Sequence, residues 1–301
     1  MLVTAHHSMG ANLLYMGDFI QAQFHLERSL FYYDDRKHSS LAFIYGQDSG
    51  VANFALLSIC LWLRGYCRQA LEKKEQSLSL ARKIGHPFTL GLAYCYATQI
   101  YHYLQNVSST QKYGEMTINF CLENEFYFWG TLTNIIVGWV NQQLGEIELG
   151  LTQMQQNLTA YLSLGTRLGQ IYYMKLTAIG YLNAGLVEEC VSLIDKGLEL
   201  ADPTGAYWKA ELYRIKGEAL IMQSKDAEAE ICFHKALEVA RSQGAVSLER
   251  RAIMSLSEFL HRCGKTEAAR QSMAQLDLNA EEFDPVDREK GMTLLAAICY
   301  C

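Results

Sequence analysis

The sequence predicts an all-α fold: a right-handed α-solenoid of about seven helical hairpins, followed by a C-terminal helix. Three observations predict it. Small residues recur about every 40 residues, the apolar residues between them repeat with helical periodicity, and no segment shows sustained strand alternation. With only 3 prolines and no Gly/Ser-rich linker, the 301 residues are predicted to form a single domain, 1–301.

The repeat is anchored on a small residue that ends one helix and is followed at +5, +9 and +12 by residues facing back onto it. Gly17, for example, is followed by Ala22, Leu26 and Ser29. Glycine allows the tight turn, and one hairpin cannot bury its own apolar face, so the hairpins are expected to stack. The anchors are Gly17, Gly65, Asn106, Gly145, Gly185, Ser224 and Gly264, separated by 48, 41, 39, 40, 39 and 40 residues, with Asn106 starting the weakest copy.

Placed on these anchors, the helices are expected to alternate with short turns along the whole chain. The apolar stretch Val51 to Leu63 is 13 residues long, too short for a bilayer span of roughly 20 residues, and predicts a buried helix. Residues 277–301 form a C-terminal capping segment. The predicted helices are 4–16, 19–33, 51–64, 67–84, 88–104, 108–123, 127–144, 147–163, 167–184, 187–201, 206–222, 226–243, 246–262, 265–276 and 285–298.

The 48-residue interval contains an insertion loop, 34–50, with the sequence DDRKHSSLAFIYGQDSG, which is the longest irregular segment. Long loops on regular scaffolds often carry function, and Tyr45, Gln47 and Asp48 are the candidate residues. The alternative is a plain connector, and the sequence leaves both open.

Composition excludes several partners. Charged residues make up 19% of the chain, the net charge is −6, and Lys and Arg are scattered, which argues against direct nucleic-acid binding. The N-terminus lacks the pattern of a secretory signal, so we expect a cytoplasmic protein without a membrane segment. No pair of the nine cysteines has C-x-x-C spacing, which favours buried thiols over a metal site; the clearest are Cys60, Cys95, Cys121, Cys190 and Cys232.

No motif supports catalysis, a metal or a cofactor. His6, His7 and His25 lack ligand spacing, and Cys299 with Cys301 would make an incomplete site. The triplet Gly264-Lys265-Thr266 has Phe259 where a phosphate-binding loop needs glycine, and the nucleophile elbow G-x-S-x-G is absent. We therefore expect a protein that is not an enzyme.

The anchor pattern resembles the tetratricopeptide repeat (TPR), although its period of about 40 exceeds the usual 34 or so, which implies longer helices. Several stretches also resemble the C-terminal TPR-like module of bacterial multidomain signalling proteins, in which a nucleotide cyclase or other output domain and an AAA or STAND-type ATPase precede the repeats. These stretches are LAFIYGQDSGVA at 41–52, GHPFTLGLA at 85–93, AELYRIKGEAL at 210–220, AEICFHKALEVARSQGAVSLERRA at 229–252 and EEFDPVD at 281–287.

The resemblance implies a non-catalytic regulatory or sensor module that binds a protein or ligand and controls an attached or adjacent ATPase or cyclase. The alternative is a free-standing TPR adaptor or scaffold that binds a peptide segment of a partner, with homo-oligomerisation through an uncapped end left open. Because the first helix of each hairpin is expected to line a concave groove, the partner-binding candidates are Tyr96, Tyr103, Trp139, Gln142, Tyr172, Lys175, Glu211, Arg214, Glu218, Glu258 and His261. Packing of the aromatic residues within the array, with the charges on a solvated face, is the competing interpretation.

Overall fold

The computed structural model describes residues 1–201 and 207–299, and in this part of the chain the secondary structure is helical throughout. The all-α prediction is confirmed. Seven hairpins follow one another and α17 (Pro285–Cys299) ends the fold, as predicted. The hairpins are α1 (Leu2–Met16) with α2 (Phe19–Tyr32), α5 (Ser49–Leu63) with α6 (Cys67–Ile84), α7 (Pro87–Tyr103) with α8 (Val107–Glu123), α9 (Tyr127–Gln143) with α10 (Ile147–Ser163), α11 (Gln170–Asn183) with α12 (Val187–Ala201), α13 (Lys209–Met222) with α14 (Asp226–Gln243), and α15 (Val246–Arg262) with α16 (Thr266–Met273).

The predicted helix boundaries agree with these within about three residues at each end, a normal uncertainty for helix termini. The predicted helix 206–222 begins at a residue outside the described part, and α13 starts at Lys209. Helix α5 is buried along nearly its whole length, as expected for the stretch from Val51 to Leu63. Among the helices that the structure describes, none has the length and apolar character needed to cross a bilayer.

Each hairpin turn contains a residue with left-handed backbone geometry, and these residues recur at the spacing of the hairpins. Gly17, for example, has φ of +84°, a conformation that costs glycine little. The third anchor was predicted one residue too late: Gln105 takes the left-handed conformation, with φ of 51°. Asn106 instead caps α8, its side chain accepting a hydrogen bond from the Ser109 N–H at 2.9 Å. Counted from Gln105, the facing positions are Thr110, Gly114 and Thr117, and all three are buried.

The insertion 34–50 is a run of short helical turns and not an irregular loop. It contains α3 (Asp35–His38), the 3₁₀ turn η1 (Ser39–Leu41) and α4 (Ala42–Tyr45). Asp48, one of the candidate residues, is only 1% exposed and caps α5 by accepting the Val51 N–H at 2.9 Å. Its other carboxylate oxygen accepts the Tyr33 hydroxyl at 2.8 Å. Local helix capping therefore accounts for Asp48, whereas Tyr45 is 66% exposed and Gln47 partly exposed.

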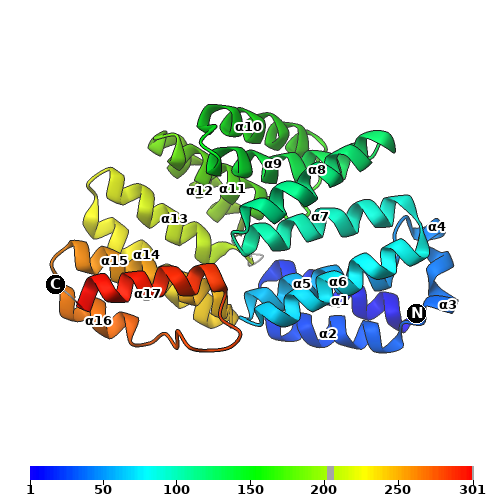
Figure 1. Ribbon diagram of the computed structural model, residues 1–301, viewed down its shortest axis with the longest axis horizontal. Coiled ribbons are helices and arrows are strands. Elements are labelled where there is room, and N and C mark those ends of the chain that lie inside the picture. Colours follow the sequence, from blue (N-terminus) through cyan, green and yellow to red (C-terminus); the bar gives the residue numbers. More distant parts are fainter. Residues whose placement is uncertain (202–206, 300–301) are drawn as a thin grey trace.

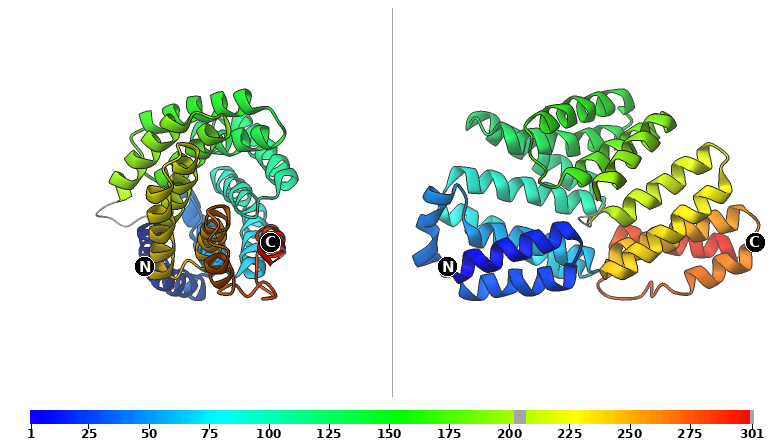
Figure 2. Two further views of the ribbon diagram at one scale, coloured as in Figure 1. Left: turned by 90° about the vertical axis from the view of Figure 1, so that its left-hand side faces the viewer. Right: turned by 180° about the vertical axis from the view of Figure 1, so that it is seen from behind.

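The stack of hairpins curls until its two ends meet. Figure 1 shows the chain rising from α1–α6, passing over the top through α7–α12 and descending through α13, so that α15 and α17 lie end to end with α5 and α6. The views in Figure 2 show the same arrangement, with helices around a common centre. A Cβ on Gly65 would lie 2.8 Å from the Val246 side chain, which shows how closely the corner after α5 approaches the start of α15.

The largest hydrophobic cluster of the described residues joins the first hairpin to the last. It runs from Leu14 of α1 through Leu57 of α5 and Trp139 of α9 to Leu248 of α15. Two smaller clusters lie within α11–α13 and within the C-terminal helices. Closure of the superhelix is therefore part of the packed core and fixes the side chains at its centre.

Candidate functional site

Four aromatic side chains from four hairpins meet at the centre of the superhelix. They are Trp62 of α5, Tyr103 of α7, Tyr172 of α11 and Trp208, the N-cap of α13, and each is at most 1% exposed. The Tyr103 ring lies 5.0 Å from Trp62, 5.0 Å from Trp208 and 5.3 Å from Tyr172. These separations are favourable for aromatic pairs, and we call the four residues the interior aromatic cluster.

Lys175 of α11 lies against this cluster. Its ammonium is 4.2 Å from the centre of the Trp208 ring and 4.9 Å from that of Tyr172, and the residue is 2% exposed. Burial lowers the pKa of Lys175 from 10.5 to about 7; the negative charge of Glu211 opposes this, and the positive charges of Arg251 and Arg214 add to it. Lys175 therefore changes its charge near neutral pH.

An ion-paired triplet on α13 continues from this point toward solvent. Arg214 holds Glu211 with two hydrogen bonds, Nε to Oε2 at 2.9 Å and Nη2 to Oε1 at 2.8 Å, and also contacts Glu218. Burial disfavours the ionised form of Glu211, but Arg214 outweighs that effect and lowers the pKa of Glu211 to about 2. Burial raises the pKa of Glu218. Side-chain exposure increases from 3% at Glu211 through 14% at Arg214 to 38% at Glu218, so the triplet leads from the interior to the surface.

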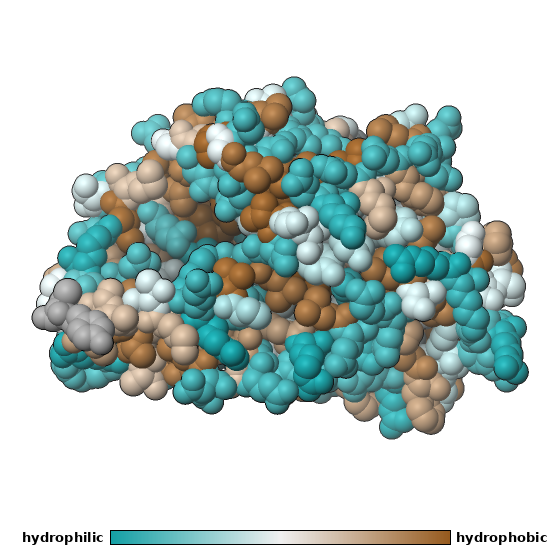
Figure 3. Space-filling view, viewed as in Figure 1, coloured by the Kyte–Doolittle hydropathy of each residue, from teal (hydrophilic) through white to brown (hydrophobic). Residues whose placement is uncertain are grey.

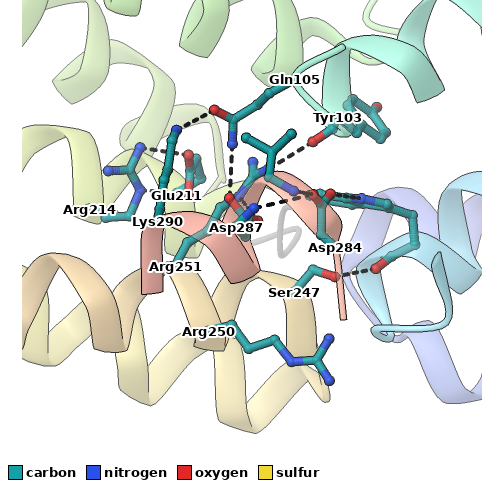
Figure 4. A network of polar contacts seen from close by, with 12 residues as sticks. Tyr103, Gln105, Glu211, Arg214, Ser247, Arg250, Arg251, Asp284, Asp287 and Lys290 are labelled. Carbon is teal, nitrogen blue, oxygen red and sulfur yellow. Dashed lines mark hydrogen bonds and ion pairs between the residues drawn. The ribbon is translucent and has the colours of Figure 1, made fainter. Parts of the chain in front are cut away.

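A second polar network, shown in Figure 4, fastens the C-terminal helices to the N-terminal half. Arg251 of α15 donates to Asp287 of α17 at 2.7 Å and to the Tyr103 carbonyl oxygen at 2.7 Å. Gln105 donates to Asp287 at 2.9 Å, and Trp62 donates its indole N–H to Asp284 at 3.3 Å. We call Trp62, Gln105, Arg251, Asp284 and Asp287 the clasp.

Helix ends explain why charged groups make these contacts. The last carbonyls of a helix lack intrahelical partners and carry partial negative charge, and the first N–H groups carry partial positive charge. Arg251 donates to the last residue of α7, and Ser247 donates to the Trp62 carbonyl near the end of α5 at 2.5 Å. Conversely, Glu282 accepts the Arg68 N–H at the start of α6 at 2.8 Å. Helix α15 and the C-terminal segment thus together contact three helix ends of the N-terminal half.

The space-filling view shows a hollow on the face of the molecule where α13 and α17 approach each other (Figure 3). Apolar surface lies in its depth and polar side chains lie on its rim. Glu218 of α13 is 38% exposed and Lys290 of α17 is exposed, and Lys290 donates to Gln105 across the gap between α17 and α7. We call this feature the central hollow.

The structure brings together six of the residues predicted for the concave face: Tyr103, Tyr172, Lys175, Glu211, Arg214 and Glu218. The first two are buried in the interior aromatic cluster and do not line an open groove. A role in partner binding stays a prediction for all eleven candidates.

The other predicted residues have separate surroundings. Trp139 packs on the His102 ring at 4.7 Å, and the Gln142 amide donates to the Gly180 carbonyl at 3.0 Å, so both contribute to the array. The hydroxyl groups of Tyr96 and Tyr15 lie 3.1 Å apart. Glu258 is exposed on α15, and within the described residues no hydrogen bond or ion pair joins His261 of the same helix to the group around Lys175.

Sequence reasoning did not select Trp62, Trp208, Arg251 or Asp287 as site residues. A usable signal was present, because the stretches 229–252 and 281–287, which carry the resemblance to signalling modules, contain Arg251 and Asp287. What the repeat pattern lacks is any indication that the two ends of the array meet. Trp62 and Trp208 were treated as residues of separate hairpins for the same reason.

The cysteines singled out in the sequence, Cys60, Cys95, Cys121, Cys190 and Cys232, are free and buried. Burial raises the pKa of each thiol, which disfavours the reactive thiolate. Cys299 is exposed, and Cys301 lies outside the described residues. Within residues 1–201 and 207–299, no group of three or more His, Cys, Asp or Glu side chains is arranged to hold a metal ion.

Comparison with known proteins supports a helical-repeat fold. No family model matches the chain. A curated relative, an uncharacterized protein of Rhizobium meliloti (strain 1021), is 23% identical over 258 residues, which cover 84% of this chain and 25% of that protein. The chain thus spans about a quarter of the length of this relative.

Solved structures with a similar arrangement of helices include the following three. A Rap protein complexed with competence and sporulation factor superposes with a TM-score of 0.60 at 9% identity, covering 99% of this chain and 98% of that one. A tetratricopeptide repeat protein from Parabacteroides merdae gives 0.49 at 14% identity over 99% of both chains. The STAND protein with a tetratricopeptide repeat sensor from Pyrococcus horikoshii gives 0.46 at 14% identity, covering 93% of this chain and 42% of that one.

Proposed function

We propose that this chain is a non-catalytic regulatory and sensor module that binds a peptide or protein segment in the central hollow. The observation that carries the proposal is the convergence of the interior aromatic cluster, Lys175 and the Glu211–Arg214–Glu218 triplet, which leads from the interior to the surface on α13, a helix at the edge of this hollow. Aromatic and arginine side chains dominate recognition sites, and mixed charges suit a peptide that carries both apolar and polar groups. The Rap structure of the same fold contains a bound factor, which supports ligand binding by such an array.

We further propose that the module acts on a signalling ATPase or nucleotide cyclase, either in the same polypeptide or encoded next to it. Two observations support this: the sequence stretches that resemble such modules, and the length of the relative, of which this chain spans a quarter. An ATPase or cyclase reading frame joined or adjacent to the coding sequence is the expected finding. A coding sequence without such a neighbour would contradict the coupling and leave the binding proposal standing.

Hydrogen exchange on the full chain tests the binding proposal directly. Peptides are selected on the protein from a synthetic library of random short peptides. We expect a selected peptide to slow exchange in α11, α13 and α17, and Glu218→Gln at the rim to weaken its binding. Glu238→Gln, an exposed change on α14, is the matched control. Protection confined to the outer helices α8, α10 and α12 would refute the proposal.

The structure also guides the choice of variants. Reversing the charge of Arg214 would place a carboxylate beside Glu211, which is 3% exposed and depends on Arg214 for its charge compensation. A double reversal of Arg214 and Glu218 is therefore expected to destabilise the fold as well as binding. Glu218→Gln avoids this problem, because Glu218 is 38% exposed and the Glu211–Arg214 pair remains intact.

A scaffold that assembles through its first hairpin is the second candidate. Leu2, Met9 and Met16 form a stripe along α1 and are 56%, 50% and 54% exposed. Phe24 and Phe31 of α2 are also exposed, at 49% and 73%. Sedimentation of the chain at increasing concentration should show association if this face pairs with a second copy, and Met9→Glu should abolish it. A monomer at all concentrations would count against the scaffold.

A further inference from the structure

Among the described residues, three cations surround the interior aromatic cluster, namely Lys175, Arg214 and Arg251, and two of them have a carboxylate partner. Arg214 is paired with Glu211 at 2.8 Å, and Arg251 with Asp287 at 2.7 Å. Lys175 has neither an ion pair nor a hydrogen bond within residues 1–201 and 207–299, although it is only 2% exposed. Buried charges are normally paired, so Lys175 is the exception that calls for an explanation.

The groups that face Lys175 come from four helices. They are Tyr172 of its own helix α11, His102 of α7, Glu211 and Arg214 of α13, and Arg251 of α15. His102 is buried and its pKa lies well below 6.5 because of burial, so its imidazole is neutral at pH 7. Glu211 is the only carboxylate among these groups, and its two oxygens accept hydrogen bonds from Arg214. Glu211 compensates the charge of Arg214, and Asp287 compensates that of Arg251, so the charge of protonated Lys175 is left without a carboxylate of its own.

An anion of matching charge would complete this environment. A carboxylate carries one negative charge, equal to the single uncompensated charge on Lys175. A phosphate group carries nearly two negative charges and would need further free donors, whereas the guanidinium groups of Arg214 and Arg251 are already engaged.

We propose that Lys175, whose ammonium lies against the rings of Trp208 and Tyr172, is the receptor for a carboxylate of the bound peptide. This inference rests on the proposed function. The carboxylate belongs either to the peptide C-terminus or to an Asp or Glu side chain. Glu218, at 38% exposed, is the most open charged group of the neighbouring triplet, so the ligand approaches from the side of the central hollow.

The test uses peptides selected on the full-length chain from a library of random short peptides with free carboxyl termini. Each selected peptide is resynthesised with a C-terminal amide and, separately, with each Asp or Glu replaced by Asn or Gln. Dissociation constants are measured for the wild type, for Lys175→Met and for the control Lys216→Met. Lys216 of α13 pairs with Asp195 at 2.5 Å on another side of the helix.

We expect removal of one carboxylate to weaken binding to the wild type and to Lys216→Met roughly tenfold or more, and to have little effect on Lys175→Met. The amide and side-chain arms show which carboxylate is bound. Peptides that bind Lys175→Met as tightly as the wild type, or that lose affinity equally on both, would overturn the inference while leaving the proposed function intact. Absence of any enriched peptide would count against both.

A measurement without a variant guards against misfolding of Lys175→Met. For the wild type, the affinity for a carboxylate peptide should decline as pH rises above about 7, where free Lys175 loses its proton. The matching amide peptide should show no such decline. Equal pH profiles for the two peptides would refute the role of Lys175.

Discussion

Replacing Arg251 by methionine should open the superhelix while the hairpins stay folded. Arg251 is 12% exposed and Asp287 is 3% exposed, so the substitution leaves a buried carboxylate without its cation. It also removes the hydrogen bond to the Tyr103 carbonyl at 2.7 Å and the contact with the Trp62 ring at 4.9 Å. Gln105 alone continues to donate to Asp287.

The magnitude follows from the burial of this pair. Removing one partner of a buried ion pair typically costs about 3–5 kcal/mol. Each hairpin contacts mainly its neighbours, so this cost falls on closure of the array and not on formation of individual helices. Since about 1.4 kcal/mol changes an equilibrium constant tenfold, the ratio of closed to open molecules should fall by a factor of at least about 100.

Small-angle X-ray scattering tests whether the superhelix opens, and circular dichroism tests whether the helices stay folded. The radius of gyration of Arg251→Met should increase, and its helical signal should be retained. Arg241→Met, which removes an ion pair with Glu249 at a side chain that is 48% exposed, should change neither. The double variant Arg251→Met with Asp287→Leu should close again, because apolar groups then replace both charges. An unchanged radius for the single variant, or a double variant as open as the single one, would refute this reasoning.

Three further changes test other parts of the structure. Lys175→Met should raise the free energy of unfolding at pH 7 by roughly 2–4 kcal/mol, because the folded-state pKa of about 7 lies below the unfolded value of 10.5. For the same reason, the free energy of unfolding of the wild type, measured by urea titration, should rise by roughly 2 kcal/mol relative to that of the variant between pH 7 and 9. A variant less stable than the wild type at pH 7 would contradict the buried charge. Gly138→Ala should lower the free energy of unfolding by about 1–3 kcal/mol, because its Cβ would lie 2.7 Å from the Gly150 carbonyl oxygen. Gly130→Ala on the same helix has no contact closer than 3.4 Å and should be neutral or stabilising. Equal melting temperatures of the two variants would argue against the packing of α9 on α10. Asp48→Ala should lower stability by about 1–2 kcal/mol in thermal melts through loss of the α5 cap, and an unchanged melt would show that the cap contributes little.

Local chemistry made most of the fold predictable from the sequence. Corners need a residue that tolerates positive φ, and the positions five residues later must be small because two helix backbones approach there. Ala22, Ala70, Ala229 and Ala269 occupy those positions and are fully buried. The error at the third corner has the same origin, because Asn106 is a good helix cap and a good corner residue, and only the backbone distinguishes the two uses.

The candidate site was predictable only in part because closure depends on distant partners. Arg251 meets the Tyr103 carbonyl across 148 residues of sequence, and Trp62 meets Asp284 across 222. A repeat pattern describes contacts between successive hairpins and contains no information about the total curvature of the array. The same pattern therefore identified Tyr103, Tyr172 and Lys175 as inward-facing residues but could not predict that the inner face is closed.

The polar character of the clasp links closure to binding. Buried ion pairs add little net stability compared with apolar contacts, but they define one geometry, and their charges are well solvated when they separate. Arg251 belongs to the clasp and also lies close enough to Lys175 to lower its pKa. A carboxylate bound at Lys175 would also attract Arg251 and compete with Asp287 for it. A ligand changes a conformational equilibrium only through a difference in its affinity for the two states. The shared Arg251 would provide such a difference, so binding at the proposed Lys175 site and fastening of α17 to the N-terminal half would be coupled, equally in both directions.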